Sequence, residues 1–165
     1  MDLLSSVAIR MPALDIVKVQ EILPHRPPFL FIDGVESYDT DKGTIDAYRC
    51  VSISDPILHG HFPGNPVVPG VVLIETMAQA AVILGALCGF YDEDKHHCFF
   101  MSIEKARFIA PVVPGDRIDV RVEALRLGRI GRFSGEISTA GKKQCTAILT
   151  AGFVPKEKLA PKDEG

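Results

Sequence analysis

The sequence HGHFPGNPVVPGVVLIETMAQAAVILGALC, residues 59 to 88, joins a rigid loop to a long apolar segment. The loop, residues 59 to 70, contains two histidines, three prolines and three glycines in twelve positions. Proline fixes φ and glycine permits backbone conformations that other residues avoid, so this composition is typical of a loop with one defined geometry. The apolar segment contains three larger polar side chains: Glu75, Thr76 and Gln79. We expect it to form a helix from about residue 70 to 90 that is buried in the fold.

The rest of the chain predicts strands that can cover this helix. Ile118, Val120 and Val122 alternate with charged residues, which is the pattern of a half-buried antiparallel strand. Further elements are expected as strands at residues 29–38, 43–51, 98–108, 132–139 and 142–153, and as a short helix at residues 15–23. A helix that is hydrophobic nearly all round must be covered nearly all round. We therefore predict an α+β hot-dog fold, in which an antiparallel β-sheet wraps around one long central helix.

Length and composition are typical of one globular domain. The chain has 165 residues, of which 47% are hydrophobic and 24% are charged, so it can bury a sizeable core and keep a polar surface. We expect a single domain over residues 1–154, with residues 1–14 as an N-terminal extension. The tail PKEKLAPKDEG, residues 155–165, balances three lysines against three acidic residues and is expected to be disordered.

Composition also argues against several classes of protein. The net charge of −3, the 7% aromatic content and the lack of a Lys/Arg run disfavour a nucleic-acid binder. Glu75 and Gln79 lie inside the apolar segment, which favours a buried helix over a membrane span. Four cysteines without a CxxC pair indicate reduced thiols. Because the first residues also lack the pattern of a secretory signal, we predict a cytoplasmic protein.

The loop and the helix together contain the parts of an elimination site. Glu75 and Gln79 are four residues apart and share a helix face. A buried carboxyl with a raised pKa can act as an acid, although a structural ion pair or hydrogen bond explains Glu75 equally well. His61 leads into a stiff Phe-Pro-Gly turn, which suits a general base, whereas His59 is better explained as a loop histidine. Gly70 begins the helix, where free amides stabilise an oxyanion. Base, amide and acid together predict β-elimination of water.

Three runs of this sequence resemble a known enzyme family. LPHRPPFLFID, GHFPGNPVVPGVVLIETMAQAA and KARFIAPVVPGD are similar to the 3-hydroxyacyl-[acyl-carrier-protein] dehydratases of type II fatty acid synthesis, FabZ type. The resemblance spans about residues 16 to 154 and implies dehydration of a (3R)-3-hydroxyacyl chain to the trans-2-enoyl product. It also implies a hot-dog homodimer, assembled in many members as a trimer of dimers, that uses no cofactor and no metal.

The resemblance assigns roles to individual residues. It implies that His61 is the catalytic histidine, that Glu75 of the partner subunit is the catalytic carboxyl, and that the Gly70 amide binds the thioester carbonyl. The Val67 carbonyl would orient the His61 ring, and the His61–Phe62 peptide would be cis. Phe62, Val67 and Gln79 complete the expected substrate-binding set. The chain departs from the family pattern at Pro27, Gly34 and Ser102, which leaves the acyl-chain length and the choice between a primary and a secondary lipid or polyketide pathway open.

Other classes of protein fit this sequence less well. A dehydratase/isomerase of FabA type usually has an aspartate in place of Glu75, and acyl thioesterases share the fold but lack the GHFPG run. A metal-binding protein would use His59, His61 and Glu75, or the cluster at residues 96–98, but neither spacing is typical of a metal site. A non-catalytic scaffold would not need His61, Gly70 and Glu75 together.

An acyl carrier protein is the expected partner, because the resemblance implies a substrate on a phosphopantetheine arm. Residues 105–132 contain seven basic and three acidic residues, an excess of four in a chain of net charge −3. Part of this excess is explained by a solvated strand face. Arg126, Arg129 and Arg132 cluster at a turn and are the residues that we expect to attract an acidic carrier.

Overall fold

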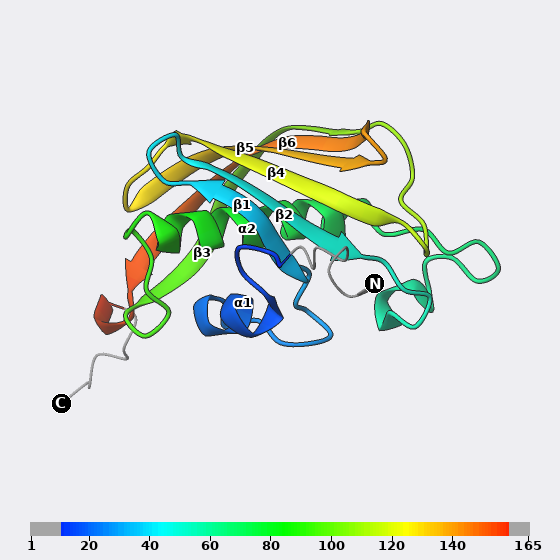
Figure 1. Ribbon diagram of the computed structural model, residues 1–165, viewed down its shortest axis with the longest axis horizontal. Helices are drawn as coiled ribbons and strands as arrows, with labels where there is room; N and C mark the ends of the chain where they lie inside the picture. Colours follow the sequence, from blue (N-terminus) through cyan, green and yellow to red (C-terminus); the bar gives the residue numbers. More distant parts are fainter. Residues whose placement is uncertain (1–10, 159–165) are drawn as a thin grey trace, which may run out of the picture.

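The computed structural model describes residues 11–158. In chain order its elements are α1 (Ile16–Ile22), β1 (Gly34–Asp39), β2 (Thr44–Cys50), the 3-10 turn η2 (Pro56–Leu58), α2 (Gly70–Leu87), β3 (His96–Phe108), β4 (Arg117–Arg126), β5 (Ile130–Thr139), β6 (Lys142–Pro155) and the 3-10 turn η3 (Lys156–Lys158). The strands form one antiparallel sheet in the order β1-β2-β4-β5-β6-β3. The sheet curves over α2, and α1 lies on the opposite side of that helix (Figure 1). The predicted hot-dog architecture is confirmed.

The central helix packs closely against the sheet. Thirteen of its eighteen residues are buried. A Cβ atom at Gly135 of β5 would lie 2.6 Å from the sulfur of Met77, and one at Gly85 of α2 would lie 2.7 Å from the Phe153 ring. These glycines therefore let helix and sheet approach to a distance that any side chain would prevent. Thr76 is also buried, and its hydroxyl donates to the Val72 carbonyl at 2.7 Å, so its polar group is satisfied within the helix.

Several predicted boundaries differ from the structure by a few residues, and the contacts explain two of these differences. The strand expected from residue 29 begins only at Gly34, because the Phe29 carbonyl and the Phe31 N–H bond to the Gln79 side chain of α2 instead of a neighbouring strand. Residues 155–158, expected to belong to a disordered tail, are ordered instead, since Pro155 ends β6 and residues 156–158 form η3. The Lys156 N–H donates to the Lys95 carbonyl, which fixes this turn. Residues 1–10 and 159–165 lie outside the described residues.

Candidate active site

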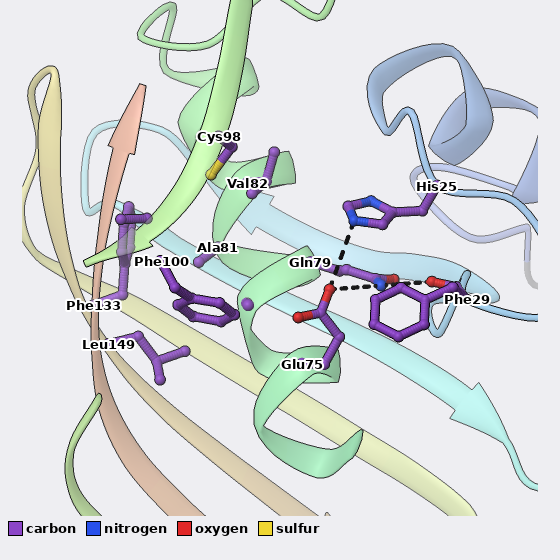
Figure 2. Close-up of a pocket in the computed structure, with 12 residues that line it drawn as sticks. His25, Phe29, Glu75, Gln79, Ala81, Val82, Cys98, Phe100, Phe133 and Leu149 are labelled. Carbon is purple, nitrogen blue, oxygen red and sulfur yellow. Dashed lines mark hydrogen bonds and ion pairs between the residues drawn. The ribbon is translucent and has the colours of Figure 1, made fainter. Parts of the chain in front are cut away.

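Gln79 connects the central helix to the segment after α1. Its side chain is 1% exposed, and its amide oxygen accepts a hydrogen bond from the Phe31 N–H at 2.8 Å. The amide nitrogen donates to the Phe29 carbonyl at 2.8 Å and to Glu75 Oε1 at 3.1 Å (Figure 2). Because the oxygen is fixed as an acceptor by the Phe31 N–H, the nitrogen must be the group that faces Glu75. Gln79 therefore holds both the loop and the carboxyl in place.

Glu75 lies at the mouth of an apolar cavity. Its side chain is 18% exposed, and the cavity of about 200 Å³ is lined mainly by Phe29, Ala78, Val82, Phe100, Phe133 and Leu149. Burial raises the pKa of the Glu75 carboxyl above its ordinary value, and the hydrogen bond from Gln79 acts in the opposite direction. The carboxyl therefore keeps its proton to a higher pH than an exposed glutamate does, which suits a proton donor that faces the cavity.

His25 faces the same carboxyl and was missed in the sequence. Its Nε2 atom lies 3.6 Å from Glu75 Oε1, and its ring stacks on Phe29 with centroids 6.0 Å apart. Burial lowers the pKa of His25, and the charge of Arg26 adds to this effect. The histidine lies fifty residues before Glu75 in the chain and has no periodic pattern around it. The run LPHRPPFLFID was the only signal that could have pointed to it.

His61 is held with a defined tautomer. Its Nδ1 atom lies 2.8 Å from the Val67 carbonyl oxygen, and because a carbonyl only accepts, Nδ1 carries the proton. The Nε2 atom is then left with a free lone pair, as a general base requires. The His61–Phe62 peptide is cis, and the two rings stack with centroids 4.1 Å apart. The Val67 contact and the cis bond, both implied by the family resemblance, are present.

Gly70 shares a second cavity with His61. This cavity of about 510 Å³ is also lined by Val67, Val68, Val71, Leu73 and residues 108–112. A Cβ atom at Gly70 would lie 2.7 Å from the Phe108 ring, so only glycine fits at this position without a shift of that ring. Within the described part of the chain, the Gly70 N–H has no hydrogen-bond partner. As the first N–H of α2, it is available to an anionic oxygen in the cavity.

The structure does not bring His61 and Glu75 to one cavity within a single chain. His61 and Gly70 line the larger cavity, whereas Glu75 and Gln79 line the smaller one. The helix explains this separation, because five residues at about 100° each place Glu75 about 140° around the axis from Gly70. One chain therefore presents His61 and the Gly70 amide on one side of α2 and the Glu75 carboxyl on another.

The remaining candidate residues lie away from both cavities. His59 is exposed, and its N–H bonds to the Pro56 carbonyl at the end of η2. Arg126 and Arg132 are paired across the turn between β4 and β5, and Arg129 lies in that turn. Arg132 forms an ion pair with Glu104 at 2.9 Å, while Arg126 and Arg129 are exposed. Over residues 11–158, no three His, Cys, Asp or Glu side chains gather as they would around a metal ion.

The fold and these side chains define the class of protein. A hot-dog fold that places a histidine in a rigid loop and a half-buried carboxyl with a raised pKa on the central helix is suited to acid–base chemistry on an acyl chain. Comparison with solved structures agrees on the fold. The dehydratase heterocomplex ApeI:P from Xenorhabdus doucetiae is 24% identical with a TM-score of 0.73, over 87% of this chain and 97% of that one. A mutant thioesterase, PA1618 from Pseudomonas aeruginosa, is 22% identical with a TM-score of 0.57, over 74% and 81%.

Sequence comparison identifies the family. A FabA-like domain matches residues 23–150. The 3-hydroxyacyl-[acyl-carrier-protein] dehydratase FabZ of a Nitratiruptor species is 42% identical, over 87% of this chain and 99% of that protein. The FabZ of Campylobacter curvus is 43% identical, again over 87% and 99%. The chain belongs to the FabA-like family, among its FabZ-type 3-hydroxyacyl-[acyl-carrier-protein] dehydratases.

Proposed function

We propose that this protein removes water from 3-hydroxyacyl-[acyl carrier protein] in fatty acid synthesis, with His61 as base and Glu75 as acid. The observation that carries the assignment of roles is the hydrogen bond from His61 Nδ1 to the Val67 carbonyl, because it leaves Nε2 as a lone-pair base. The raised pKa of Glu75 supports the complementary role of proton donor.

The reaction balances with these groups alone. His61 Nε2 takes a proton from the carbon between the thioester and the hydroxyl-bearing carbon. The electron pair of that C–H bond forms the double bond as the C–O bond breaks, and Glu75 gives its proton to the departing hydroxide. During the step, negative charge grows on the thioester oxygen, where the Gly70 N–H can stabilise it. The products are the 2-enoyl thioester and water. His61 then releases its extra proton to solvent, and Glu75 takes a proton from solvent, which restores the enzyme.

The acid is contributed by the partner subunit of a homodimer. The separation of His61 and Glu75 around α2 supports this arrangement, since a second copy can place its Glu75 against the cavity of His61 and Gly70. The edge of the sheet supports it as well. β3 pairs with β6 on one side only, and its exposed apolar residues are Phe99, Phe100, Met101, Ile103 and Phe108. A long apolar strand edge of this kind favours pairing with another chain. We also propose that three such homodimers assemble into a trimer of dimers.

The substrate arrives on an acyl carrier protein, and the enzyme works in the cytoplasm without cofactor or metal. Arg126 and Arg129 make no ion pair with the described residues, which leaves their charges available to an acidic carrier. Within residues 11–158, α2 alone is long and apolar enough to span a membrane. Its residues are mostly buried inside the sheet, as expected for a core helix.

Mass spectrometry of carrier-bound 3-hydroxyacyl chains of several lengths tests the function directly. We expect loss of one water from the carrier-bound chain, with the thioester intact, and the length profile reports which pathway the enzyme serves. Release of the free acid from the carrier would instead indicate a thioesterase, and an unchanged substrate at every length would contradict the proposal.

A further inference from the structure

The contacts around Glu75 extend the candidate site by one residue. We propose that His25 is a positioning residue that acts with Gln79 to hold Glu75 Oε1, so that the catalytic proton is carried by Oε2. This inference rests on the proposed function, in which Glu75 is the acid.

Both polar neighbours of Glu75 approach the same oxygen. Gln79 Nε2 lies 3.1 Å and His25 Nε2 lies 3.6 Å from Oε1. Figure 2 shows the second oxygen turned away from both of them, towards the side of the cavity where Phe100 lies. In a protonated carboxyl, N–H donors bond to the oxygen that lacks the hydrogen. The Gln79 hydrogen bond to Oε1, with His25 Nε2 approaching the same oxygen, therefore leaves Oε2 as the oxygen that presents its O–H to the cavity.

The surroundings of His25 select the tautomer that this role needs. Its Nδ1 atom is buried and has no partner within the described part of the chain, so the atom that meets a polar group is Nε2. With hydrogen on Nε2, the ring donates towards Oε1. A separation of 3.6 Å is too long for a direct hydrogen bond, and contacts at catalytic groups commonly shorten when substrate binds. Because the His25 ring stacks on Phe29, a small rotation of the ring is the movement that can bring Nε2 closer to Oε1.

Glu75 acts better as an acid beside a neutral His25 than beside a positively charged His25. A cation beside Glu75 would favour the carboxylate and remove the proton that the reaction uses. Burial keeps the pKa of His25 below its ordinary value, so the ring is neutral at neutral pH. His25 also borders an adjoining cavity of about 190 Å³. The other titratable or charged groups that face the pair or line this cavity are Arg26, Tyr91, Glu93, His96, His97, Cys98 and Lys156. The guanidinium of Arg26 donates to the carbonyls of Gln20, Leu23 and His25, so its polar partners are backbone groups and not the Glu75 carboxyl.

The contact becomes stronger at the moment the acid acts. When Glu75 gives up its proton, negative charge spreads over both oxygens, and an N–H on Oε1 stabilises the charged form more than the neutral one. His25 thus makes Glu75 a more effective donor without touching the substrate. Removal of the donor is expected to raise the pKa of Glu75 and to slow the proton transfer.

Substitutions at His25 separate this role from simple packing. His25→Phe keeps a ring on Phe29 but removes the donor, His25→Leu is a second donor-free variant, and His25→Gln restores an N–H at a similar reach. His59→Phe is the matched control, because His59 is exposed and has no contact with Glu75. The readouts are kcat and KM on a carrier-bound 3-hydroxyacyl substrate across pH, with thermal melting to establish that each variant folds.

We expect a fall in kcat of about 10- to 100-fold for His25→Phe and His25→Leu, as for loss of a hydrogen bond to a charged group, with KM nearly unchanged. The alkaline limb of the pH profile should move to higher pH, since Glu75 then keeps its proton longer. His25→Gln should recover most of the rate and the wild-type limb, and His59→Phe should resemble wild type.

Two results would overturn the inference. A folded donor-free variant with the wild-type rate and profile would show that Glu75 does not need His25. A His25→Gln variant as slow as His25→Phe would show that a fixed donor is not what the histidine supplies.

Wild-type enzyme and Glu75→Gln are measured in the same series. A wild type that does not dehydrate the substrate would refute the proposed function, whereas an active wild type with an inactive Glu75→Gln leaves that function intact whatever happens at His25.

Discussion

At the scale of single residues, the two histidines of the loop have different surroundings. His61 is fixed by the Val67 carbonyl and borders the cavity of Gly70, while His59 is exposed at the end of η2. We expect His61→Ala to reduce the dehydration rate by about 10²- to 10⁴-fold, the usual contribution of a general base. His59→Ala should keep most of the activity. Steady-state rates on carrier-bound substrate check both, and equal losses for the two variants would show that the base has been assigned wrongly.

The buried carboxyl of Glu75 also affects stability. Its pKa in the folded protein is raised above the ordinary 4.5, so the folded state holds a proton that the unfolded chain releases. The free energy of unfolding therefore falls as pH rises from 4.5 through the raised value. Glu75→Gln removes this loss while keeping a similar shape.

We predict that Glu75→Gln is inactive and melts at a higher temperature than wild type at about pH 8, with the difference shrinking towards pH 4.5. Scanning calorimetry at several pH values measures this difference. A constant difference across the range would mean that the Glu75 carboxyl titrates at its ordinary pKa.

Residue patterns predicted part of this site and missed another part. His61, Gly70 and Glu75 stand in one continuous run, so their composition and helical spacing pointed to them. His25 could not be found in this way, because its contact with Glu75 depends on how the segment after α1 folds back onto α2. Such a contact between distant residues leaves no periodic signal in either segment.

At the scale of elements, the close approach of β5 and α2 fixes the space inside the sheet. A Cβ at Gly135 would lie 2.6 Å from the Met77 sulfur, and Met77 is fully buried. We predict that Gly135→Ala lowers the free energy of unfolding by about 1 to 3 kcal/mol, as expected for overpacking of a core. Gly60→Ala is the matched control, since nothing lies within 4 Å of a Cβ there. Urea unfolding of the two variants gives the comparison, and equal stabilities would show that the core can accommodate the methyl group.

Hydrophobic periodicity predicted the elements better than it predicted their ends. The apolar run from Gly70 and the alternation in β4 correspond to α2 and to a half-buried strand. The segment at residues 29–33 has strand-like composition, but the Gln79 amide bonds the Phe29 carbonyl and the Phe31 N–H, and β1 begins only at Gly34. One long-range side chain therefore overrides the local propensity.

At the scale of the whole molecule, Arg126 and Arg129, which are exposed near the β4–β5 turn, are proposed to attract the acidic carrier protein. Charge reversal at Arg126 and Arg129 is expected to raise KM for carrier-bound substrate by about 10-fold, because exposed charges mainly affect encounter. The variant should process a pantetheine thioester surrogate with the kcat and KM of the wild type, since neither arginine borders a cavity with His61 or Glu75. The carrier preference should also weaken with added salt. Equal losses on both substrates would mean that the arginines support the fold.

The central claim is that each working site combines His61 of one subunit with Glu75 of its partner, and subunit mixing tests it most directly. Inactive His61→Ala and Glu75→Ala proteins are combined under conditions that allow exchange, which labelled subunits can verify. Half of the randomly exchanged dimers are mixed and each has one complete site, so activity should rise to about a quarter of the wild-type rate. Continued inactivity after verified exchange would contradict the account, because it would mean that both groups must come from the same chain.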